Sequence, residues 1–390
     1  MPQHPATLRP SAWCAEHVRA IGDLAPHTIA AIDPAALTPA LPGVDLWDLW
    51  PLQNADGTTA LFDGWSIWFV LSAPVLPDPE MRHAVARIRL MAHRRGVGRD
   101  GEWRDGGNAL PDGLNPGSRE WAGSALFHSE TGDVTLFYTV AGFKGEEQTS
   151  VAQRLFQTRG TLTVTDGIPA ITGWSPPVES FTSDDHDYVL VNQREGVPGF
   201  IKGFRDPAHF RDPADGRTYI LFTGSLKAST HTHNACIGIA RAEDAALTQW
   251  TLLPPLISAD TLNNEQERPL VIHRNGFYYL FWSTQRKVFA PDGPSGPNGI
   301  YGMVAEHLFG PWEPLNGTGL VACNPEHVPF QAYSWWVDND LIVWGFADYA
   351  GVSREELIDD GAWRRDHFAG TPAPTFRLAL DGRRGWVEQA

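Results

Sequence analysis

The chain contains very little cysteine. Cys14, Cys236 and Cys323 are its only three cysteines among 390 residues, and they lie far apart. An odd number at such distances does not supply a disulfide framework, and no Cys-x-x-Cys or mixed Cys/His spacing typical of a zinc site occurs. The sequence therefore argues against both kinds of scaffold, and we expect simple buried or surface thiols.

Positive charge is also scarce. The 30 lysine and arginine residues face 46 aspartate and glutamate residues, which gives a formal net charge of −16 at pH 7. Nucleic acids and anionic membranes both attract positive protein surfaces, so neither is an expected partner. No apolar run approaches the roughly 18 residues of a membrane-spanning helix.

The N-terminal residues lack the pattern of a classical export signal. Residues 1–26 contain no basic segment followed by an apolar core. We therefore expect either a cytoplasmic protein or one that is exported by a route independent of a classical signal peptide.

Aromatic residues, glycine and proline are abundant. The chain has 16 Trp, 19 Phe, 8 Tyr, 38 Gly and 31 Pro, a composition that favours many short strands joined by turns over long helices. Residues 1–43 differ and suggest short helices and loops. There we expect Ser11 to cap a helix that runs through Trp13, Val18 and Ile21.

One unit recurs from residue 44 onward: a turn of Gly, Asp or Asn, followed by a strand rich in aromatic and β-branched residues. Its five copies are DGWSIWFVLS, TGDVTLFYTV, DGRTYILFTG, RNGFYYLFWS and DNDLIVWGFA, which begin at Asp63, Thr131, Asp215, Arg274 and Asp338. Their strands start 59–84 residues apart, which leaves room for about four strands per unit.

The repeat predicts an all-β fold. We expect a five-bladed β-propeller over residues 44–390, with the N-terminal segment 1–43 packed on it in a single domain, because no linker separates the repeats. A β-sandwich with long insertions remains the alternative. Four segments rich in Gly and Pro could either wall a site or be solvated insertions: 96–117, 142–148, 182–198 and 290–298.

Acidic residues lie among apolar strand residues at matching places in the repeats. Upstream of the marked strands are Asp48 in LWDLWPLQ, Asp206 in FRDPAHF and Glu267 in NNEQERPLVI. The innermost strands of propeller blades surround one axis, so these side chains could gather at one end of it. These stretches, together with EWAGSALF and PFQAYSWWV upstream of the other two marked strands, also contain Trp47, Glu120, Trp121, Ser124, Arg205, Glu265, Arg268, Gln331 and Tyr333.

Carboxylates beside tryptophans can perform glycoside chemistry. One carboxylate attacks the anomeric carbon, a second donates a proton to the leaving oxygen, and a third can hold sugar hydroxyls. Tryptophan faces pack on sugar rings, and the guanidinium groups of Arg205 and Arg268 can orient hydroxyls. Any single acidic residue is more simply explained as a turn or salt-bridge residue, but three in apolar strands favour a site.

Other chemistries find little support. His231 and His233 lack a third metal ligand at a telling spacing, and the WAGSA segment lacks the Gly-x-Ser-x-Gly pattern of a nucleophile elbow. No glycine-rich phosphate loop opens a helix, which argues against nucleotide chemistry.

At these residues the chain resembles the levansucrase family of glycoside hydrolases, family 68, which includes inulosucrases and some bacterial β-fructofuranosidases. The matching segments are LWDLWPLQ, ARIRL, DGLNPGSREWAGSALF, ITGWSPPVES, GFRDP, EQERPLVI, GPNGIYGMV, GPWEPLNGTGLV and PFQAYS. They follow the family order from about residue 44 to residue 335. The family fold is a five-bladed propeller, so the resemblance implies the same architecture.

The resemblance also implies roles for individual residues. It makes Asp48 the nucleophile, Asp206 the transition-state stabiliser and Glu267 the general acid/base. The implied reaction cleaves sucrose through a covalent fructosyl-enzyme and passes the fructosyl group to a sugar or to water. Expected ligands are sucrose and fructose-containing oligosaccharides, with no cofactor and no metal. Further expected substrate contacts are Trp47, Trp121, Ser124, Arg205, Glu265, Arg268, Gln285, Arg286 and Tyr333.

Four departures from the family pattern concern the acceptor side. Ala122 and Thr223 stand where Ser and Glu are common, Trp335 stands where His is common, and Gln285–Arg286–Lys287 replaces a segment that usually carries His or Arg. We therefore expect the enzyme to cleave sucrose, while the sequence does not define which acceptor receives the fructosyl group. The alternatives are a β-fructofuranosidase that mainly hydrolyses sucrose and a sugar-binding propeller without activity.

Overall fold

The repeated strands form hairpins because their turns contain residues that accept a left-handed backbone. The computed structural model describes residues 9–95, 101–191, 201–354 and 360–389. In it, Asp63 and Gly64 have φ angles of 49° and 83°, and Asn275 and Gly276 have 52° and 79°. Two consecutive left-handed residues make the tight hairpin turn whose twist matches that of the flanking strands.

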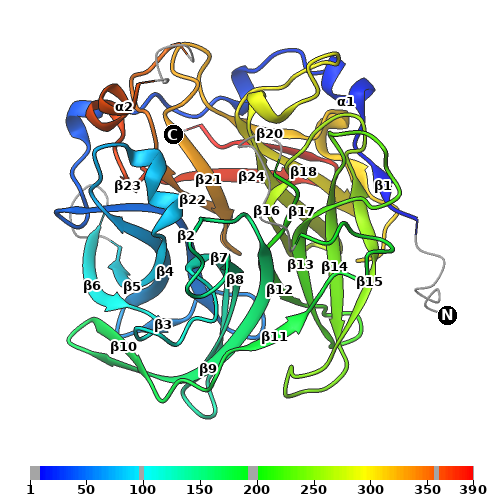
Figure 1. The fold of residues 1–390 in the computed structure, drawn as a ribbon. Helices are drawn as coiled ribbons and strands as arrows, with labels where there is room; N and C mark the ends of the chain where they lie inside the picture. The colour runs from blue at the N-terminus through cyan, green and yellow to red at the C-terminus, as the bar shows by residue number, and fades with distance from the viewer. Residues whose placement is uncertain (1–8, 96–100, 192–200, 355–359, 390) are drawn as a thin grey trace.

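The described residues form four hydrogen-bonded sheets, and the largest combines two antiparallel sets of strands (Figure 1). The first set contains β2 (Val44–Gln53), β3 (Leu61–Phe62), β4 (Trp65–Pro74), β5 (Arg87–Arg94) and β6 (Glu102–Asn108). The second contains β7 (Arg119–His128), β8 (Asp133–Ala141), β9 (Gln153–Thr165), β10 (Ile168–Thr172) and β11 (Val178–Phe181). The two sets join where β2 and β7 pair in parallel, through Leu52 with Ala125 and Gln53 with Leu126.

Each of the three other sheets follows the same plan of consecutive antiparallel strands. One contains β12 (Phe204–Arg211), β13 (Thr218–Ser225), β14 (Ala235–Ala242) and β15 (Trp250–Ser258), with β1 (Ser11–Ala12) at its edge. The next contains β16 (Glu267–Arg274), β17 (Phe277–Thr284), β18 (Gly299–Ala305), β19 (Glu313–Pro314) and β20 (Leu320–Cys323). The last contains β21 (Ala332–Val337), β22 (Ile342–Ala347), β23 (Thr371–Pro372), β24 (Phe376–Asp381) and β25 (Arg384–Val387).

Helices are few and short. They are α1 (Ala15–Arg19), α2 (Gly361–His367) and the 3₁₀ turns η2 (Ala25–His27), η3 (Pro34–Ala36), η4 (Pro79–Ala84), η5 (Arg286–Val288) and η6 (Leu315–Gly317). None of these described helices has the length and apolar character needed to cross a membrane. The segment 96–117 contains β6 and so is not a plain loop, while residues 96–100 and 192–198 lie outside the described residues.

The predicted helix capped by Ser11 is wrong. Ser11 lies in β1, which pairs in parallel with β15, and its hydroxyl accepts a hydrogen bond of 2.9 Å from the Trp312 backbone. This pairing satisfies the backbone of residues 11–12 in an extended form, so the helix starts later, after Cys14. Trp13 is fully buried, and its indole donates to the Thr318 carbonyl at 3.0 Å.

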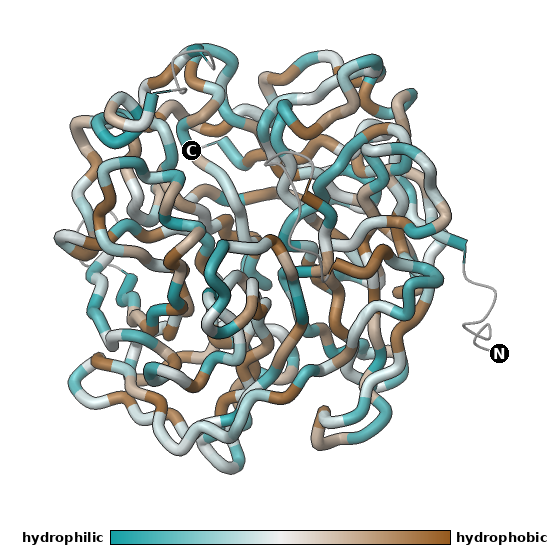
Figure 2. The backbone as a smooth tube through the Cα atoms, viewed as in Figure 1, coloured by the Kyte–Doolittle hydropathy of each residue, from teal (hydrophilic) through white to brown (hydrophobic). Residues whose placement is uncertain are grey.

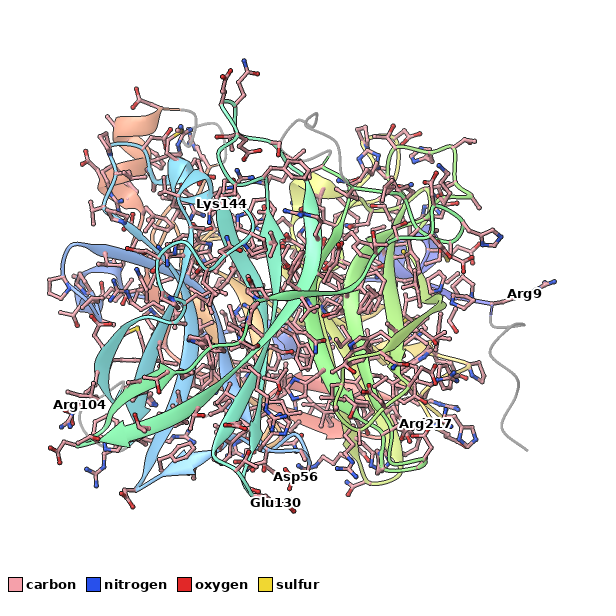
Figure 3. The ribbon with its side chains drawn as sticks, turned by 60° about the horizontal axis from the view of Figure 1, so that its bottom comes forward. Arg9, Asp56, Arg104, Glu130, Lys144 and Arg217 are labelled. Carbon is pink, nitrogen blue, oxygen red and sulfur yellow. The ribbon has the colours of Figure 1, made fainter. Side chains whose placement is uncertain are left out.

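The first strands of the sets surround one another. β2 contacts β7, β7 contacts β12, β12 contacts β16, β16 contacts β21, and β21 contacts β2. Contacts between the first and the last set of strands include the rings of Trp68 and Trp344, which are tilted by 42° with centroids 4.4 Å apart. Hydrophobic stretches run through the strands and many outer loops are hydrophilic (Figure 2). Charged side chains such as Arg9, Arg104 and Glu130 lie at the margin (Figure 3).

Each of these inner strands also shifts its register at one point. The shifts lie between Trp47 and Leu49 in β2, Trp121 and Gly123 in β7, Arg205 and Ala208 in β12, Glu267 and Leu270 in β16, and Tyr333 and Trp336 in β21. Four of the bulges hold a non-glycine residue with left-handed φ: Asp48 (32°), Asp206 (60°), Arg268 (52°) and Ser334 (58°). Bulges redirect side chains, so they set which residues face the end of the axis.

The bulge of β7 requires glycine at position 123. A Cβ atom there would lie 1.9 Å from the carbonyl oxygen of Phe137 on β8. We expect Gly123→Ala to lower the free energy of unfolding by about 1–3 kcal/mol, since the two strands must separate to admit the methyl group. Gly22→Ala is the control, because no atom lies within 4 Å of a Cβ at Gly22. Equal urea midpoints for the two variants would contradict this account of the bulge.

Candidate active site

A cavity of about 750 Å³ opens where the inner strands carry their bulges. Asp48 of β2, Asp206 of β12 and Glu267 of β16 all line it. The three predicted catalytic carboxylates, which are far apart in sequence, therefore share one space. Seven of the nine predicted substrate contacts line the same cavity: Trp47, Trp121, Arg205, Glu265, Arg268, Gln285 and Tyr333.

Asp48 interacts with a fixed positive charge, that of Arg268. The Arg268 guanidinium donates to the Ser334 carbonyl at 2.9 Å, to the Ser334 hydroxyl at 2.8 Å and to the Leu49 carbonyl at 2.6 Å. Burial raises the pKa of Asp48, while the charge of Arg268 and a hydrogen bond to Ser334 oppose this rise. Because its N–H groups are bound to the protein, Arg268 supports the site mainly as an anchored cation.

Asp206 is almost completely buried. Its Oδ2 atom lies 3.0 Å from the Thr223 hydroxyl and accepts a 3.3 Å bond from the Arg268 backbone N–H. Its own N–H donates to the Thr139 hydroxyl at 2.9 Å. Burial raises the pKa of Asp206 to about 6, against the influence of the Arg205 guanidinium. Thr223 thus contacts this carboxylate, whereas a glutamate at the same place would add a second negative charge.

Glu267 is held from two sides. Arg205 Nη2 donates to its Oε1 atom at 2.9 Å, and the Tyr333 hydroxyl donates to its Oε2 atom at 2.5 Å. Arg205 also lies 3.5 Å from the Glu265 carboxylate and 3.6 Å from that of Asp206. One guanidinium therefore links three acidic side chains, and Glu267 of β16 is held by residues of two other sheets, Arg205 of β12 and Tyr333 of β21.

The cavity has more negative than positive groups at its centre. Burial and the neighbouring Glu267 raise the pKa of Glu265 to about 7. Four carboxyl groups, those of Asp48, Asp206, Glu265 and Glu267, stand around the guanidinium groups of Arg205 and Arg268. Like charges at close range cannot all stay ionised in a buried space, so the group retains protons near neutral pH.

Two predicted substrate contacts lie elsewhere. Ser124 is fully buried outside the cavity, where its hydroxyl accepts from the His209 backbone and contacts the His209 ring, both at 3.0 Å. The bulge just before it shifts the alternation of β7 and turns Ser124 towards β12. Arg286 also lies outside the cavity, because its backbone N–H binds Asn298 and starts η5 with the side chain exposed. Its neighbours Gln285 and Lys287 do line the cavity.

Sequence reasoning missed one wall of the cavity. Glu80, Arg82 and His83 of η4 line it, as do Asp348, just after β22, and Arg364 of α2. Two of these positions come from the segment MRHAVARIRL, whose second half carried the family resemblance. The only available signal was thus a charged stretch next to a recognised motif.

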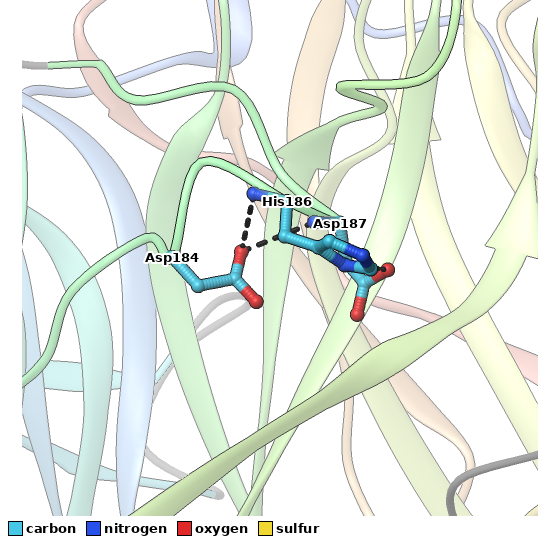
Figure 4. A group of neighbouring side chains, drawn as sticks. All are labelled: Asp184, His186 and Asp187. Carbon is cyan, nitrogen blue, oxygen red and sulfur yellow. Dashed lines mark hydrogen bonds and ion pairs between the residues drawn. The ribbon is translucent and has the colours of Figure 1, made fainter.

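One cluster of side chains outside the cavity brings together atoms of the kind that bind metal ions. Asp184, His186 and Asp187 offer ligand-type atoms within 4.8 Å of one another, the one such grouping among the described residues (Figure 4). The Asp184 carboxylate accepts from the backbone N–H groups of His186 at 2.9 Å and Asp187 at 3.1 Å. These bonds are typical of an aspartate-stabilised turn, and they account for the geometry.

Comparison with known proteins places the chain in a family. A profile of the levansucrase/invertase family, glycoside hydrolase family 68, matches residues 5–234 and 228–390. The chain belongs to this family of enzymes. The levansucrase of Rahnella aquatilis is 31% identical over 419 residues, which cover 97% of this chain and 94% of that protein. The levansucrase of Zymomonas mobilis is 35% identical over 370 residues, or 88% of this chain and 82% of that protein.

A solved structure agrees with this assignment. The inulosucrase of Halalkalicoccus jeotgali bound to kestose superposes with a TM-score of 0.86 at 36% identity, over 97% of this chain and 95% of that one. The fold of the described strands is therefore the fold of this enzyme family.

The raised pKa of Glu265 predicts how the stability of the protein depends on pH. An unfolded glutamate has a pKa of about 4.3, so the folded protein holds this proton more tightly and is stabilised below that pH. The contribution is lost as pH rises through about 7. Glu265→Gln should therefore gain about 1–3 kcal/mol of stability relative to the unsubstituted protein between pH 4 and pH 8. Urea unfolding at several pH values, with exposed Glu130→Gln as the control, measures this change. A pH-independent difference would contradict the assignment.

Proposed function

We propose that this enzyme cleaves sucrose in two displacement steps and passes the fructosyl group to a sugar acceptor or to water. The observation that carries the proposal is the meeting of Asp48, Asp206 and Glu267, from three inner strands, in one cavity. Membership in the levansucrase/invertase family and similarity to named levansucrases over nearly the whole chain support it.

In the first step the Asp48 carboxylate attacks the anomeric carbon of the fructosyl unit. A carboxylate–carbon bond forms while the glycosidic bond breaks, and Glu267 donates a proton to the leaving glucosyl oxygen. In the second step Glu267 takes a proton from the incoming hydroxyl, which attacks the same carbon and frees Asp48. Asp206 and Arg205 hold sugar hydroxyls as positive charge develops on the ring.

The surroundings of the carboxylates suit these roles. Arg268 is anchored on backbone and side-chain oxygens, so its positive charge supports an ionised Asp48. Glu267 lies close to other buried acidic groups. The repulsion between their negative charges favours a state in which one of these groups holds a proton. Trp47 and Trp121 line the cavity and provide apolar faces for a sugar ring. This chemistry uses protons and carboxylates alone, and it requires no cofactor.

For the architecture we propose a five-bladed propeller that forms one domain. Dividing the ten-stranded sheet at its short parallel contact between β2 and β7 leaves five antiparallel sets, whose first strands contact one another in a closed order. Residues 9–43, the described part of the N-terminal segment, belong to this domain, since Trp13 packs in the same hydrophobic cluster as Trp282 and Tyr301. A catalytic site at one end of the axis fits this arrangement.

Asp48→Asn tests the nucleophile. We expect glucose release from sucrose to disappear, because the amide keeps the shape of the side chain but cannot attack the anomeric carbon. Sucrose should still bind, which tryptophan fluorescence can follow through Trp47 and Trp121. Substantial glucose release by the folded variant would remove Asp48 from this role, and no release by the unsubstituted protein would leave only a sugar-binding function.

The acceptor can be tested through residues 285 and 286, which follow β17. Gln285 lines the cavity and Arg286 does not, so the two provide a matched pair. Gln285→His should change the ratio of free fructose to glucose by roughly two- to tenfold, the value of one hydrogen bond to a neutral sugar, with sucrose consumption less affected. Arg286→Ala should leave this ratio unchanged. A ratio near one in the unsubstituted enzyme would identify mainly hydrolysis; equal effects of both substitutions would contradict the placement of Gln285.

A further inference from the structure

The η4 turn holds both tryptophans of the cavity. The Arg82 guanidinium lies 5.6 Å from the centre of the Trp47 ring, and the His83 imidazole meets the same ring edge-on at 5.8 Å. The Trp121 indole donates to the His83 carbonyl at 3.3 Å. The orientation of the two aromatic faces therefore depends on where η4 lies.

η4 is too short to position itself. It spans six residues between β4 and β5, and its first turn is capped by Asp78, whose carboxylate accepts from the Glu80 N–H at 3.0 Å. Further anchors come from the last part of the chain. The Tyr349 hydroxyl donates to Glu80 at 2.8 Å, and the Phe368 ring lies 4.6 Å from the Arg82 guanidinium.

The strongest of these anchors is a two-point ion pair. Arg364 of α2 donates to Asp78 through Nε at 2.9 Å and through Nη2 at 2.5 Å. The two side chains are only 17% and 29% exposed, so water competes weakly with the pair. A planar guanidinium bound at two points fixes distance and direction together, which a single bond does not. Arg364 also lines the cavity next to the turn that it holds.

We propose that the Asp78–Arg364 pair is a positioning device for substrate binding, through which helix α2 near the C-terminus sets the two tryptophans of the sugar site. The inference rests on the proposed sucrose cleavage and adds positioning residues to it. Neither Asp78 nor Arg364 carries out a chemical step. Their loss should loosen contacts that bind the ground state and the transition state alike, which raises KM and spares kcat.

The same helix supplies a matched control. Arg365, the next residue, donates two hydrogen bonds of 2.6 Å and 3.1 Å to the carboxylate of Asp45 in β2. The Arg365 side chain is 20% exposed and that of Asp45 is 4% exposed. This second ion pair also connects α2 to the first set of strands. Neither Arg365 nor Asp45 lines the cavity. The second ion pair therefore shares the stabilising role of the first pair without an ion pair to η4, which Arg365 approaches only through the Phe368 ring at 5.4 Å.

The experiment measures KM and kcat for sucrose, together with the melting temperature, in single substitutions of both pairs. We expect Arg364→Gln and Asp78→Asn to raise KM by about three- to tenfold with kcat within about twofold, the size of one lost interaction. Arg364→Lys should recover part of the loss. Arg365→Gln and Asp45→Asn should lower the melting temperature and leave KM unchanged.

The outcomes separate the possible failures. If Arg364→Gln and Asp78→Asn leave KM unchanged, or if Arg365→Gln raises it equally, the positioning role is refuted. The combination of Arg364→Gln with Asp78→Asn should cost no more than either alone, because both remove one pair. If Arg364→Gln fails to fold, Asp78→Asn and Arg364→Lys still decide the matter. If the unsubstituted enzyme releases no glucose from sucrose, the proposed function fails instead.

Discussion

The site depends on a backbone constraint: the inner strands must leave regular pairing at the end of the axis that holds the cavity. Asp48, Asp206, Arg268 and Ser334 each take a left-handed backbone at such a bulge, a conformation that costs a non-glycine residue about 1–3 kcal/mol. In regular strands, neighbouring side chains would point to opposite faces. The bulges instead turn consecutive residues, such as Trp47 with Asp48 and Arg205 with Asp206, towards one cavity. The surrounding sheets hold this strained backbone in place.

Two arginines then make the acidic cavity possible. Arg205 donates to Glu267 at 2.9 Å and lies close to Asp206 and Glu265, while Arg268, whose charge acts on Asp48, is anchored by oxygens of Leu49 and Ser334. A carboxylate without such a partner would be protonated or would move into water. Since these two cations face the four carboxyl groups of Asp48, Asp206, Glu265 and Glu267, the centre of the site keeps both ionised and protonated carboxyls, which is the combination that a two-step glycoside reaction needs.

Local sequence signals predicted much of the fold. Turns such as Asp63–Gly64 and Asn275–Gly276 depend on residues that accept positive φ, so the hairpins could be recognised one at a time. The three acidic residues that share the cavity could be found because charged residues stand out in apolar strands. Ser124 lies outside the cavity because the register shift in β7 exchanges the two faces of the strand, and the local mark of that shift is a single glycine, Gly123. The helix at Ser11 was wrong because pairing with distant β15 outweighs a local capping preference. Arg364 and Asp348 were missed because their partners lie more than 250 residues away in the chain.

The central claim is that Asp48 becomes covalently bound to the fructosyl group. The most direct measurement is the mass of peptides from a Glu267→Gln variant quenched during reaction with a fructosyl donor that has a good leaving group. Such a donor needs little protonation, so the first step should proceed while the second, which needs a general base, slows. The account predicts one added fructosyl unit on the peptide that contains Asp48. A fructosyl unit on a peptide containing Asp206 instead, or an unmodified protein that still releases the leaving group, would contradict it.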